Sequence, residues 1–305
     1  MTTNIKTLVV ILGPTGSGKT DLSIRVARHF GAPILSVDSR QVYRGMAVGT
    51  AQPDTEQLAA VPHYFIADRE VTSSFSCGDF EQEALTLLRK LFGTHDVVVA
   101  VGGSGLYIDA LCDGMDDLPP VDTALRNRLV EQVGREGLAP LLRELERLDP
   151  DYYVSVDRNN PQRVVRAVEV CLQSGRPYSS FRRRACARRD FRTIKIGTAL
   201  PREVLYGRIN RRVDAMMAAG LEREARNLYP HKELNALRTV GYRELFDYFD
   251  GKGTLEEAVE LIKRNTRRYA KRQLTWFRRD GSILWVDPSD TEVVISRIEG
   301  VWGNR

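Results

Sequence analysis

Cysteine and histidine are scarce in this chain, which contains four of each in 305 residues. The cysteines, Cys77, Cys112, Cys171 and Cys186, lie far apart and form no Cys-x-x-Cys pair. Their spacing argues against a disulfide framework or a zinc centre, and we expect reduced, structural thiols. The histidines are equally scattered and make no pair at helical spacing, so they do not indicate a metal site.

Long apolar runs are also missing. No stretch approaches the roughly 20 residues needed to span a bilayer, and residues 1–6 lack the apolar core of a secretion signal. The content of 42% hydrophobic and 28% charged residues is ordinary for a globular protein. We therefore expect a cytoplasmic protein without a membrane partner, and we expect a monomer.

The most specific motif present is a match to G-x-x-x-x-G-K-[ST], the phosphate-binding loop. It consists of Gly13, Pro14, Thr15, Gly16, Ser17, Gly18, Lys19 and Thr20. An apolar run over 7–12 predicts a strand before it, and 21–30 predicts a helix after it, which is the context that the motif requires. Backbone amides, the helix N-terminus and Lys19 bind phosphate in such a loop, and the Thr20 hydroxyl is placed to hold Mg²⁺. The motif predicts a bound di- or triphosphate without distinguishing between them.

Strands alternate with helices around this loop, which predicts an α/β fold: a P-loop NTPase-like doubly wound parallel sheet with a helical insertion domain. The further expected strands are 32–37, 96–101, 193–200 and 282–286, with a short edge segment at 61–66. Residues from about 121 to 189 predict helices at 123–133, 138–148 and 161–173 and no strand. We expect a core in two parts, 1–117 and 191–305, and an insertion domain over 118–190.

Three segments follow strands and should meet at the carboxyl edge of the sheet, where α/β proteins bind ligands: the phosphate-binding loop, 38–41 and 102–105. Asp38 ends an apolar strand, and two roles are open to it, a magnesium ligand or a base acting on substrate. The Gly102-Gly103-Ser104-Gly105 run offers amides and a hydroxyl beside the phosphates, or is a tight strand-to-helix turn.

The charge is uneven along the chain. Residues 1–115 hold 9 Lys and Arg against 12 Asp and Glu, a balance of −3, while residues 161–305 hold 30 against 18, a balance of +12. A basic half attached to a phosphate-binding core predicts a polyanionic partner larger than one nucleotide. The densest basic cluster, six arginines in eleven residues, consists of Arg182, Arg183, Arg184, Arg188, Arg189 and Arg192.

Two other basic segments are expected to be helical. A long helix over 255–279 carries eight Lys and Arg with aromatic residues among them, a composition that favours nucleic-acid binding. Arg208 and Arg212 lie four apart near the expected start of another helix, and one of them is placed to reach a phosphate. Arg163 and Arg166 share a face of a third helix, either solvated or contacting an RNA backbone.

Taken together, these segments resemble the tRNA dimethylallyltransferase (tRNA isopentenyltransferase) family over nearly the whole chain. The matching motifs are GPTGSGKT at 13–20, SVDSRQVYRGMAVGTAQP at 36–53, VGGSGLYIDAL at 101–111, NNPQRVVRAVEV at 159–170, RINRRVDAMMAAGLEREA at 208–225, RTVGYREL at 238–245 and KRQLTWFRR at 271–279. The resemblance implies transfer of a dimethylallyl group from dimethylallyl diphosphate, with Mg²⁺, to the exocyclic amine of the adenosine 3′ to the anticodon in tRNA.

The resemblance also assigns roles to residues. It implies a catalytic set of Asp38 as general base, Thr20, Ser104 and Arg212, with the phosphate-binding loop holding the diphosphate. It implies contacts to the tRNA anticodon stem-loop from Asp38, Ser39, Arg40, Gln41, Ser104, Arg126, Gln162, Arg163, Val164, Val165, Arg166, Arg238, Gly241, Tyr242 and Arg243. Two alternatives remain at this point: an ATP-dependent small-molecule P-loop kinase, and a non-catalytic RNA-binding P-loop protein.

Overall fold

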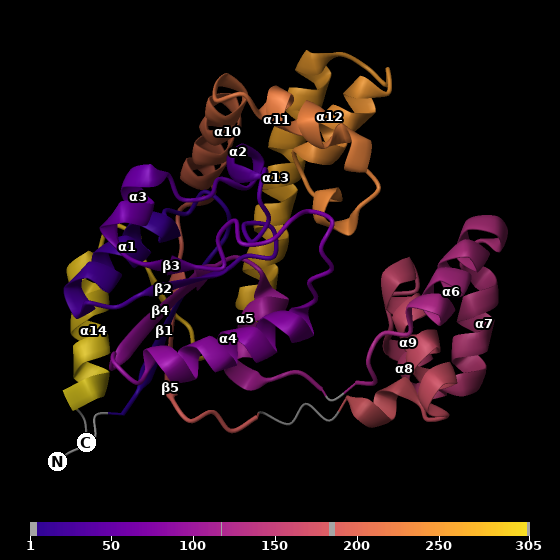
Figure 1. The fold of residues 1–305 in the computed structure, drawn as a ribbon, viewed down its shortest axis with the longest axis horizontal. Coiled ribbons are helices and arrows are strands. Elements are labelled where there is room, and N and C mark those ends of the chain that lie inside the picture. Colours follow the sequence, from indigo (N-terminus) through magenta and orange to yellow (C-terminus); the bar gives the residue numbers. More distant parts are fainter. Residues whose placement is uncertain (1–4, 117, 183–186, 304–305) are drawn as a thin grey trace. The chain divides into compact units, whose positions relative to one another are not determined.

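A computed structural model describes residues 5–116, 118–182 and 187–303 of the chain (Figure 1). The described residues divide into two compact units, one formed by 1–112 with 188–305 and the other by 113–187. The insertion expected over 118–190 differs from the second unit by a few residues at each end. No helix among the described residues is both long enough and apolar enough to cross a membrane.

Six parallel strands form one sheet in the first unit, in the order β3-β2-β4-β1-β5-β6. Their bounds are β1 (Thr7–Leu12), β2 (Ile34–Val37), β3 (His63–Tyr64), β4 (Val97–Gly102), β5 (Arg192–Thr198) and β6 (Leu284–Val286). Strand β1 lies between β4 and β5, with Leu12 opposite Gly102 and Gly197. All six residues of β1 are buried, as a central parallel strand requires. The predicted doubly wound fold class is confirmed.

Alternate side chains of β1 pack into two different hydrophobic layers. Val10 packs in the layer that contains residues of α4 and α5, whereas Val9 packs in the layer that contains residues of α1 and α14. Figure 1 shows α14 beside α1. The helices of this unit up to β5 are α1 (Lys19–Phe30), α2 (Ala47–Thr50), α3 (Thr55–Ala60), α4 (Cys77–Leu91) and α5 (Gly105–Asp113).

Beyond the carboxyl edge of the sheet lie further helices of the first unit: α10 (Arg202–Ala218), α11 (Leu221–Leu228), α12 (Tyr242–Phe249) and α13 (Leu255–Phe277), with short 3-10 turns η2 (Tyr229–His231) and η3 (Asn235–Leu237). The last helix, α14 (Thr291–Gly303), packs instead with α1 on one face of the sheet. Tyr242, Leu245 and Ile262 belong to the core that joins α11, α12 and α13. The expected start of a helix at Arg208 is wrong, because α10 begins six residues earlier, after Pro201.

The second unit is helical, as predicted. It contains α6 (Thr123–Glu136), α7 (Ala139–Leu148), α8 (Pro150–Ser155), α9 (Pro161–Ser174) and the 3-10 turn η1 (Tyr178–Phe181). The short helix α8 was not predicted, although Asp149 caps it by accepting a hydrogen bond from the Tyr152 amide and Pro150 occupies its first turn. Arg183 and Arg184 of the predicted arginine cluster lie outside the described residues.

A fully buried carboxylate holds this unit together. Glu169 on α9 accepts hydrogen bonds from Arg166 at 2.8 Å and from Arg126 at 2.7 Å. It also accepts from the backbone amide of Asp122 at 3.2 Å, and Arg166 donates to the Pro119 carbonyl at 2.6 Å. A buried carboxylate is stable only when it is paired and hydrogen-bonded, so both arginines are structural here.

We predict that Arg166→Met destabilises the protein by about 3 kcal/mol, because it removes one of the two cations that neutralise buried Glu169. Urea denaturation followed by far-ultraviolet circular dichroism measures the change. The matched control is Arg135→Met, since Arg135 is 76% exposed and pairs with Glu136, and we expect it to cost less than about 0.5 kcal/mol. Equal losses in the two variants would contradict the structural role of the Glu169 cluster.

Candidate functional site

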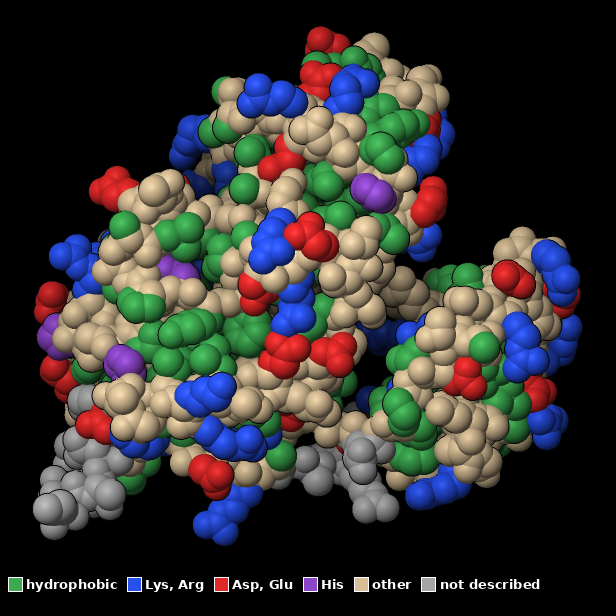
Figure 2. Space-filling view, viewed as in Figure 1, with side chains coloured by type: hydrophobic (Ala, Val, Ile, Leu, Met, Phe, Trp, Pro, Cys, Tyr) green, Lys and Arg blue, Asp and Glu red, His purple; other side chains and the backbone are tan. Residues whose placement is uncertain are grey.

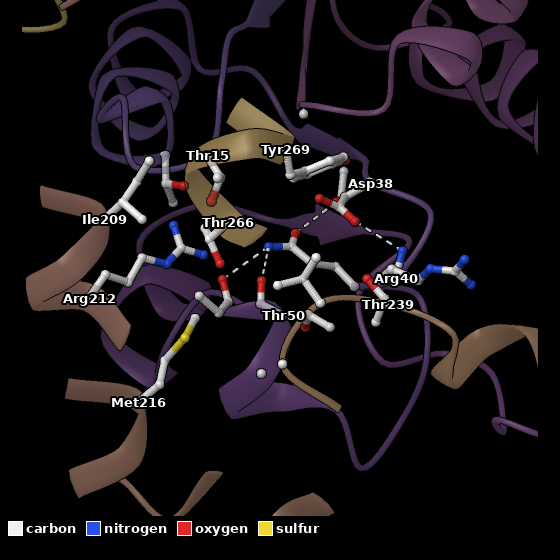
Figure 3. Close-up of a pocket in the computed structure, with 18 of the residues that line it drawn as sticks. Thr15, Asp38, Arg40, Thr50, Ile209, Arg212, Met216, Thr239, Thr266 and Tyr269 are labelled. Atoms are coloured by element: carbon white, nitrogen blue, oxygen red, sulfur yellow. Dashed lines mark hydrogen bonds between the residues drawn. The ribbon is translucent and has the colours of Figure 1, made fainter. Parts of the chain in front are cut away.

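A pocket opens at the carboxyl edge of the sheet in the first unit (Figure 3). The phosphate-binding loop, the end of β2, helix α2 and helices α10 and α13 each contribute residues to its wall. The polar and charged lining residues include Thr15, Lys19, Thr20, Asp38, Arg40, Gln41, Thr50, Arg212, Thr239, Thr266, Tyr269 and Gln273. The predicted convergence of the loop and the Asp38 segment is therefore observed.

The phosphate-binding loop has the backbone that its glycines allow. Gly16 and Gly18 have φ angles of 80° and 87°, in the left-handed region that other residues rarely adopt. The Ser17 hydroxyl lies 2.6 Å from the hydroxyl of Thr198 at the end of β5, and Thr198 in turn donates to the Leu12 carbonyl. These bonds fix the loop to the strand beside it, so its shape is set before any ligand binds.

Positive charge is concentrated in the pocket. Burial and, to a lesser extent, the neighbouring Arg212 lower the pKa of Lys19 from 10.5 to about 8, and Asp38 opposes this shift. Burial likewise lowers the pKa of Arg212, again opposed by Asp38. Figure 3 shows the Arg212 guanidinium pointing into the pocket, near Thr15 and Thr266. Of the two arginines proposed to reach a phosphate, Arg212 lines the pocket, while Arg208 is exposed beside Gly18 and Pro288.

Asp38 stands where β2 ends and faces the same pocket (Figure 3). One of its oxygens, Oδ1, accepts a hydrogen bond of 2.9 Å from the Arg40 amide, which closes a tight turn. The Ser39 amide in this turn donates to Ser104 Oγ at 3.0 Å. Ser104 therefore braces the turn that carries Asp38 and is not among the residues that line the pocket.

The Gln41 side chain lines the pocket but is already occupied by hydrogen bonds. Its Nε2 donates to the carbonyls of Thr50 and Ala51, at 3.3 and 3.0 Å, and its Oε1 accepts from Ser36 Oγ at 2.9 Å. A Gln41 contact to RNA would have to replace or share these bonds. In this structure Gln41 connects the end of β2 to helix α2.

The glycines of the 102–105 segment serve close packing. None of Gly102, Gly103 and Gly105 has a positive φ angle. A Cβ on Gly103 would lie 2.2 Å from Gln273 Nε2, and a Cβ on Gly105 would lie 2.5 Å from the Trp276 ring. The segment is thus a strand-to-helix turn against which α13 packs, the simpler of the two interpretations of its sequence.

The remaining residues with a predicted tRNA contact differ in exposure. Gln162 and Arg163 are exposed on α9, but Val164 and Val165 are buried in the core of the second unit, so their side chains do not face a partner. Tyr242 is also fully buried, and its hydroxyl donates to Glu224 at 2.7 Å. A contact from any of these three residues to tRNA would therefore have to come from its backbone, and the contact stays a prediction.

Two of the predicted contact residues before and within α12 are exposed. Arg238 and Arg243 lie at the surface, and Gly241, with Thr239 and Val240, lines the pocket. Gly241 adopts a φ angle of 102°, and its amide donates to Glu244 at the start of α12. The 238–243 stretch therefore reaches the pocket through its backbone and small side chains.

Sequence reasoning missed two pocket residues on α13. Gln273 is buried between the phosphate-binding loop and Gly103, and Tyr269 lies beside Asp38 in Figure 3. Burial and the negative charge of Asp38 raise the pKa of the Tyr269 phenol, which keeps it protonated and able to donate. Both residues lie at helical spacing with Ile262 and Thr266, and that periodicity was the available signal.

The outer side of α13 is basic. Arg264, Arg268, Lys271 and Arg272 are exposed there at helical spacing, and within the described residues none of them pairs with an acidic side chain. By contrast, the face drawn in Figure 2 shows Lys and Arg side chains interspersed with Asp and Glu. Part of the positive charge of residues 161–305 is therefore unpaired on the outer side of α13, the helix that also lines the pocket.

Comparison with known proteins points to one family. A family model described as IPP transferase matches residues 41–280. The tRNA dimethylallyltransferase 2 of Parabacteroides distasonis is 50% identical over 294 residues, which covers 96% of this chain and 98% of that protein. The tRNA dimethylallyltransferase of Christiangramia forsetii is 52% identical over 280 residues, which covers 92% of this chain and 93% of that protein.

Solved structures agree with these relatives. The full-length tRNA isopentenylpyrophosphate transferase of Bacillus halodurans superposes with a TM-score of 0.72 at 37% identity, covering 97% of both chains. A eukaryotic dimethylallyltransferase acting on tRNA superposes with a TM-score of 0.82 at 24% identity, covering 98% of this chain and 80% of that one. The second likeness supports the fold alone.

Lys19 makes anion binding by the pocket dependent on pH. Because its pKa is about 8 in the free protein, its charge is lost as the pH rises through that value. Comparing wild type with Lys19→Ala by calorimetry with inorganic pyrophosphate isolates this effect, since the ligand's own ionisation is common to both. We predict that the ratio of the wild-type affinity for pyrophosphate to the Lys19→Ala affinity falls by about tenfold between about pH 7 and about pH 9.5. A ratio that stays constant over this range would show that Lys19 remains charged.

Proposed function

The chain belongs to the tRNA dimethylallyltransferase family, and from that premise we propose that it transfers a dimethylallyl group from dimethylallyl diphosphate to the exocyclic amine of the adenosine 3′ to the anticodon in tRNA, giving N6-dimethylallyladenosine. The observation that carries the proposal is one pocket lined both by a carboxylate, Asp38, and by cations that include Lys19 and Arg212. The reaction needs an acceptor for a proton at one end of the substrate and stabilisation of a leaving diphosphate at the other.

Asp38 is proposed as the general base. The lone pair of an adenine amine is delocalised into the ring, so the amine needs a carboxylate to accept a proton as the new carbon–nitrogen bond forms. Strand β4 separates β2 from β1, which places the end of β2 roughly 10 Å from the end of β1. That separation leaves room for a substrate between Asp38 and the phosphate-binding loop. It favours the role of Asp38 as a base over its role as a second ligand, beside Thr20, of a magnesium ion.

The leaving diphosphate is proposed to rest on the phosphate-binding loop, with Lys19 and Arg212 on its oxygens. Negative charge grows on these oxygens as the bond to carbon breaks, and preorganised cations stabilise that charge without reorganising. Thr20 is the residue that would hold Mg²⁺, which when bound would neutralise part of this charge. No group of three His, Cys, Asp or Glu side chains suited to a metal occurs in the described residues. A magnesium ion here would rely on substrate oxygens and water, as is usual for this ion.

The tRNA is proposed to bind with its backbone against the exposed basic side of α13. The target adenosine must leave the base stack to reach Asp38, which is easier from a single-stranded anticodon loop than from a duplex. Arg264, Arg268 and Lys271 stand on the helix whose other side lines the pocket, so phosphate contacts there would bring the loop to the site.

We predict that Asp38→Ala lowers kcat for transfer of labelled dimethylallyl diphosphate to undermodified tRNA by about 10³-fold, the size of a lost general base. Pyrophosphate should still bind, because Lys19, Arg212 and the loop remain. The matched control is Asp247→Ala, an exposed aspartate on α12 paired with Lys252, for which we expect wild-type rates. Near wild-type kcat in Asp38→Ala would exclude Asp38 as the base. If the wild-type protein instead transferred a phosphoryl group from ATP and no prenyl group to tRNA, the kinase alternative would be supported.

We predict that the double variant Arg268→Ala with Lys271→Ala raises the KM for tRNA at least about fivefold and lowers the salt dependence of binding, because two phosphate contacts are lost. The KM for dimethylallyl diphosphate should not change. Arg89→Ala with Lys90→Ala, two exposed cations at the end of α4, is the control. If both double variants weaken tRNA binding equally, the α13 surface has no special part in recognition.

A further inference from the structure

A carboxylate that does not itself line the pocket holds one of the pocket's walls. Glu224 on α11 accepts a hydrogen bond of 2.8 Å from each of the Val48 and Gly49 backbone amides, one on each carboxylate oxygen. It also accepts a bond of 2.7 Å from the Tyr242 hydroxyl. All three neighbours are donors, which suits an ionised carboxylate because such a group only accepts. Glu224 therefore joins α2, α11 and α12 at one point.

The position of helix α2 depends on bonds of this kind. Met46, the residue before the helix, is fully buried, but none of the four residues of α2 is buried. The first amides of a helix have no carbonyl partner within it, and here Glu224, 175 positions further along the chain than Gly49, supplies the acceptor. At the other end of α2, Gln41 donates to the carbonyls of Thr50 and Ala51. Side chains of other elements thus hold both ends.

The Tyr242 side chain makes this junction rigid. It is fully buried in the core that joins α11, α12 and α13. Burial and the charge of Glu224 raise the pKa of Tyr242, so its hydroxyl keeps the proton that it donates. A Cβ on Gly49 would lie 2.5 Å from the Tyr242 oxygen, so α2 approaches the tyrosine directly. Because Tyr242 follows the pocket-lining residues 239–241, the junction fixes two walls of the pocket.

The α2 wall faces the groups that are proposed to react. Gly49, Thr50 and Ala51 line the pocket. Figure 3 shows Thr50 between Arg212 on one side and Asp38 on the other. In the proposed reaction Asp38 accepts a proton from the amine and Arg212 faces the leaving diphosphate, so the substrate atoms between them would lie against this wall. A misplacement of about 1 Å in such a site can lower a rate about 100-fold.

We propose that Glu224 is a positioning residue for the transfer reaction, which sets the place of the α2 wall against the substrate atoms between Asp38 and Arg212. It acts through the Val48 and Gly49 amides and touches none of the reacting groups. This inference rests on the proposed function and deepens it, because it adds to the site a residue that lies outside the pocket.

The test replaces Glu224 by Gln, which keeps the size of the side chain but leaves at least one of the three donors without an acceptor. We expect kcat for prenyl transfer to tRNA to fall at least about tenfold, while the affinity for pyrophosphate stays within about threefold of wild type because the phosphate-binding loop is unchanged. Amide hydrogen exchange of residues 47–51, measured by mass spectrometry, should become at least about tenfold faster. The matched control is Glu222→Gln on the same helix, where Glu222 pairs with Arg226, and we expect wild-type values.

A second variant, Glu224→Ala, removes all three hydrogen bonds. We expect it to lower kcat at least about 100-fold, more than Glu224→Gln does. All rates are measured well below the unfolding midpoint seen by circular dichroism, so a loss of stability alone leaves kcat unchanged. If Glu224→Ala does not fold, the comparison of Glu224→Gln with Glu222→Gln decides.

Three outcomes would overturn the proposal. Unchanged exchange of residues 47–51 in Glu224→Gln would show that Glu224 does not hold the wall. Faster exchange with wild-type kcat would show that the reaction does not depend on the position of the wall. A loss of pyrophosphate affinity as large as the loss of kcat would show a general collapse of the site. If the wild-type protein transferred no prenyl group, the proposed function would fail, and the exchange data would still decide whether Glu224 holds α2.

Discussion

Concentrated positive charge in a partly closed pocket is the constraint on which the rest of the site depends. Lys19 and Arg212 lie together with Asp38 as the nearby carboxylate, and burial lowers the pKa of both cations. The unfolded chain holds the Lys19 proton up to its ordinary pKa of 10.5, so the folded state gains relative stability as the pH rises from about 8 to 10.5. At neutral pH this charge is a cost to the free protein, and an anionic ligand offsets it.

A pocket of this kind works only if its charges cannot relax away from the ligand. The central position of β1, the bond between Ser17 and Thr198, and the packing of α13 on the 103–105 turn all restrain the phosphate-binding loop and its neighbours. On the opposite side, the Ser104 hydroxyl supports the Ser39 amide and so fixes the turn that carries Asp38. Donors held in this way stabilise developing charge without first reorganising.

Structural features that depend on neighbouring residues could be predicted from the sequence, whereas contacts between residues far apart in the chain could not. The loop, β1 and β4 were predictable because each is a contiguous run with its own conformational signal. The bond from Thr15 to Gln273 joins residues 258 positions apart, and no local pattern predicts it. Val164 and Val165 illustrate a different case: the family resemblance implies tRNA contact for the whole 162–166 segment, whereas helical periodicity places both valines on the apolar side of α9.

Glycine at this edge of the sheet is required for two separate physical reasons. Gly16 and Gly18 are required by positive φ angles that turn backbone amides toward an anion, whereas Gly103 and Gly105 are required because side chains of α13 approach too closely for a Cβ. Only the first pair has the left-handed backbone typical of an anion-binding loop. The edge therefore offers fewer anion-binding amides than its glycine content suggests, and Lys19 and Arg212 must supply the remaining positive charge.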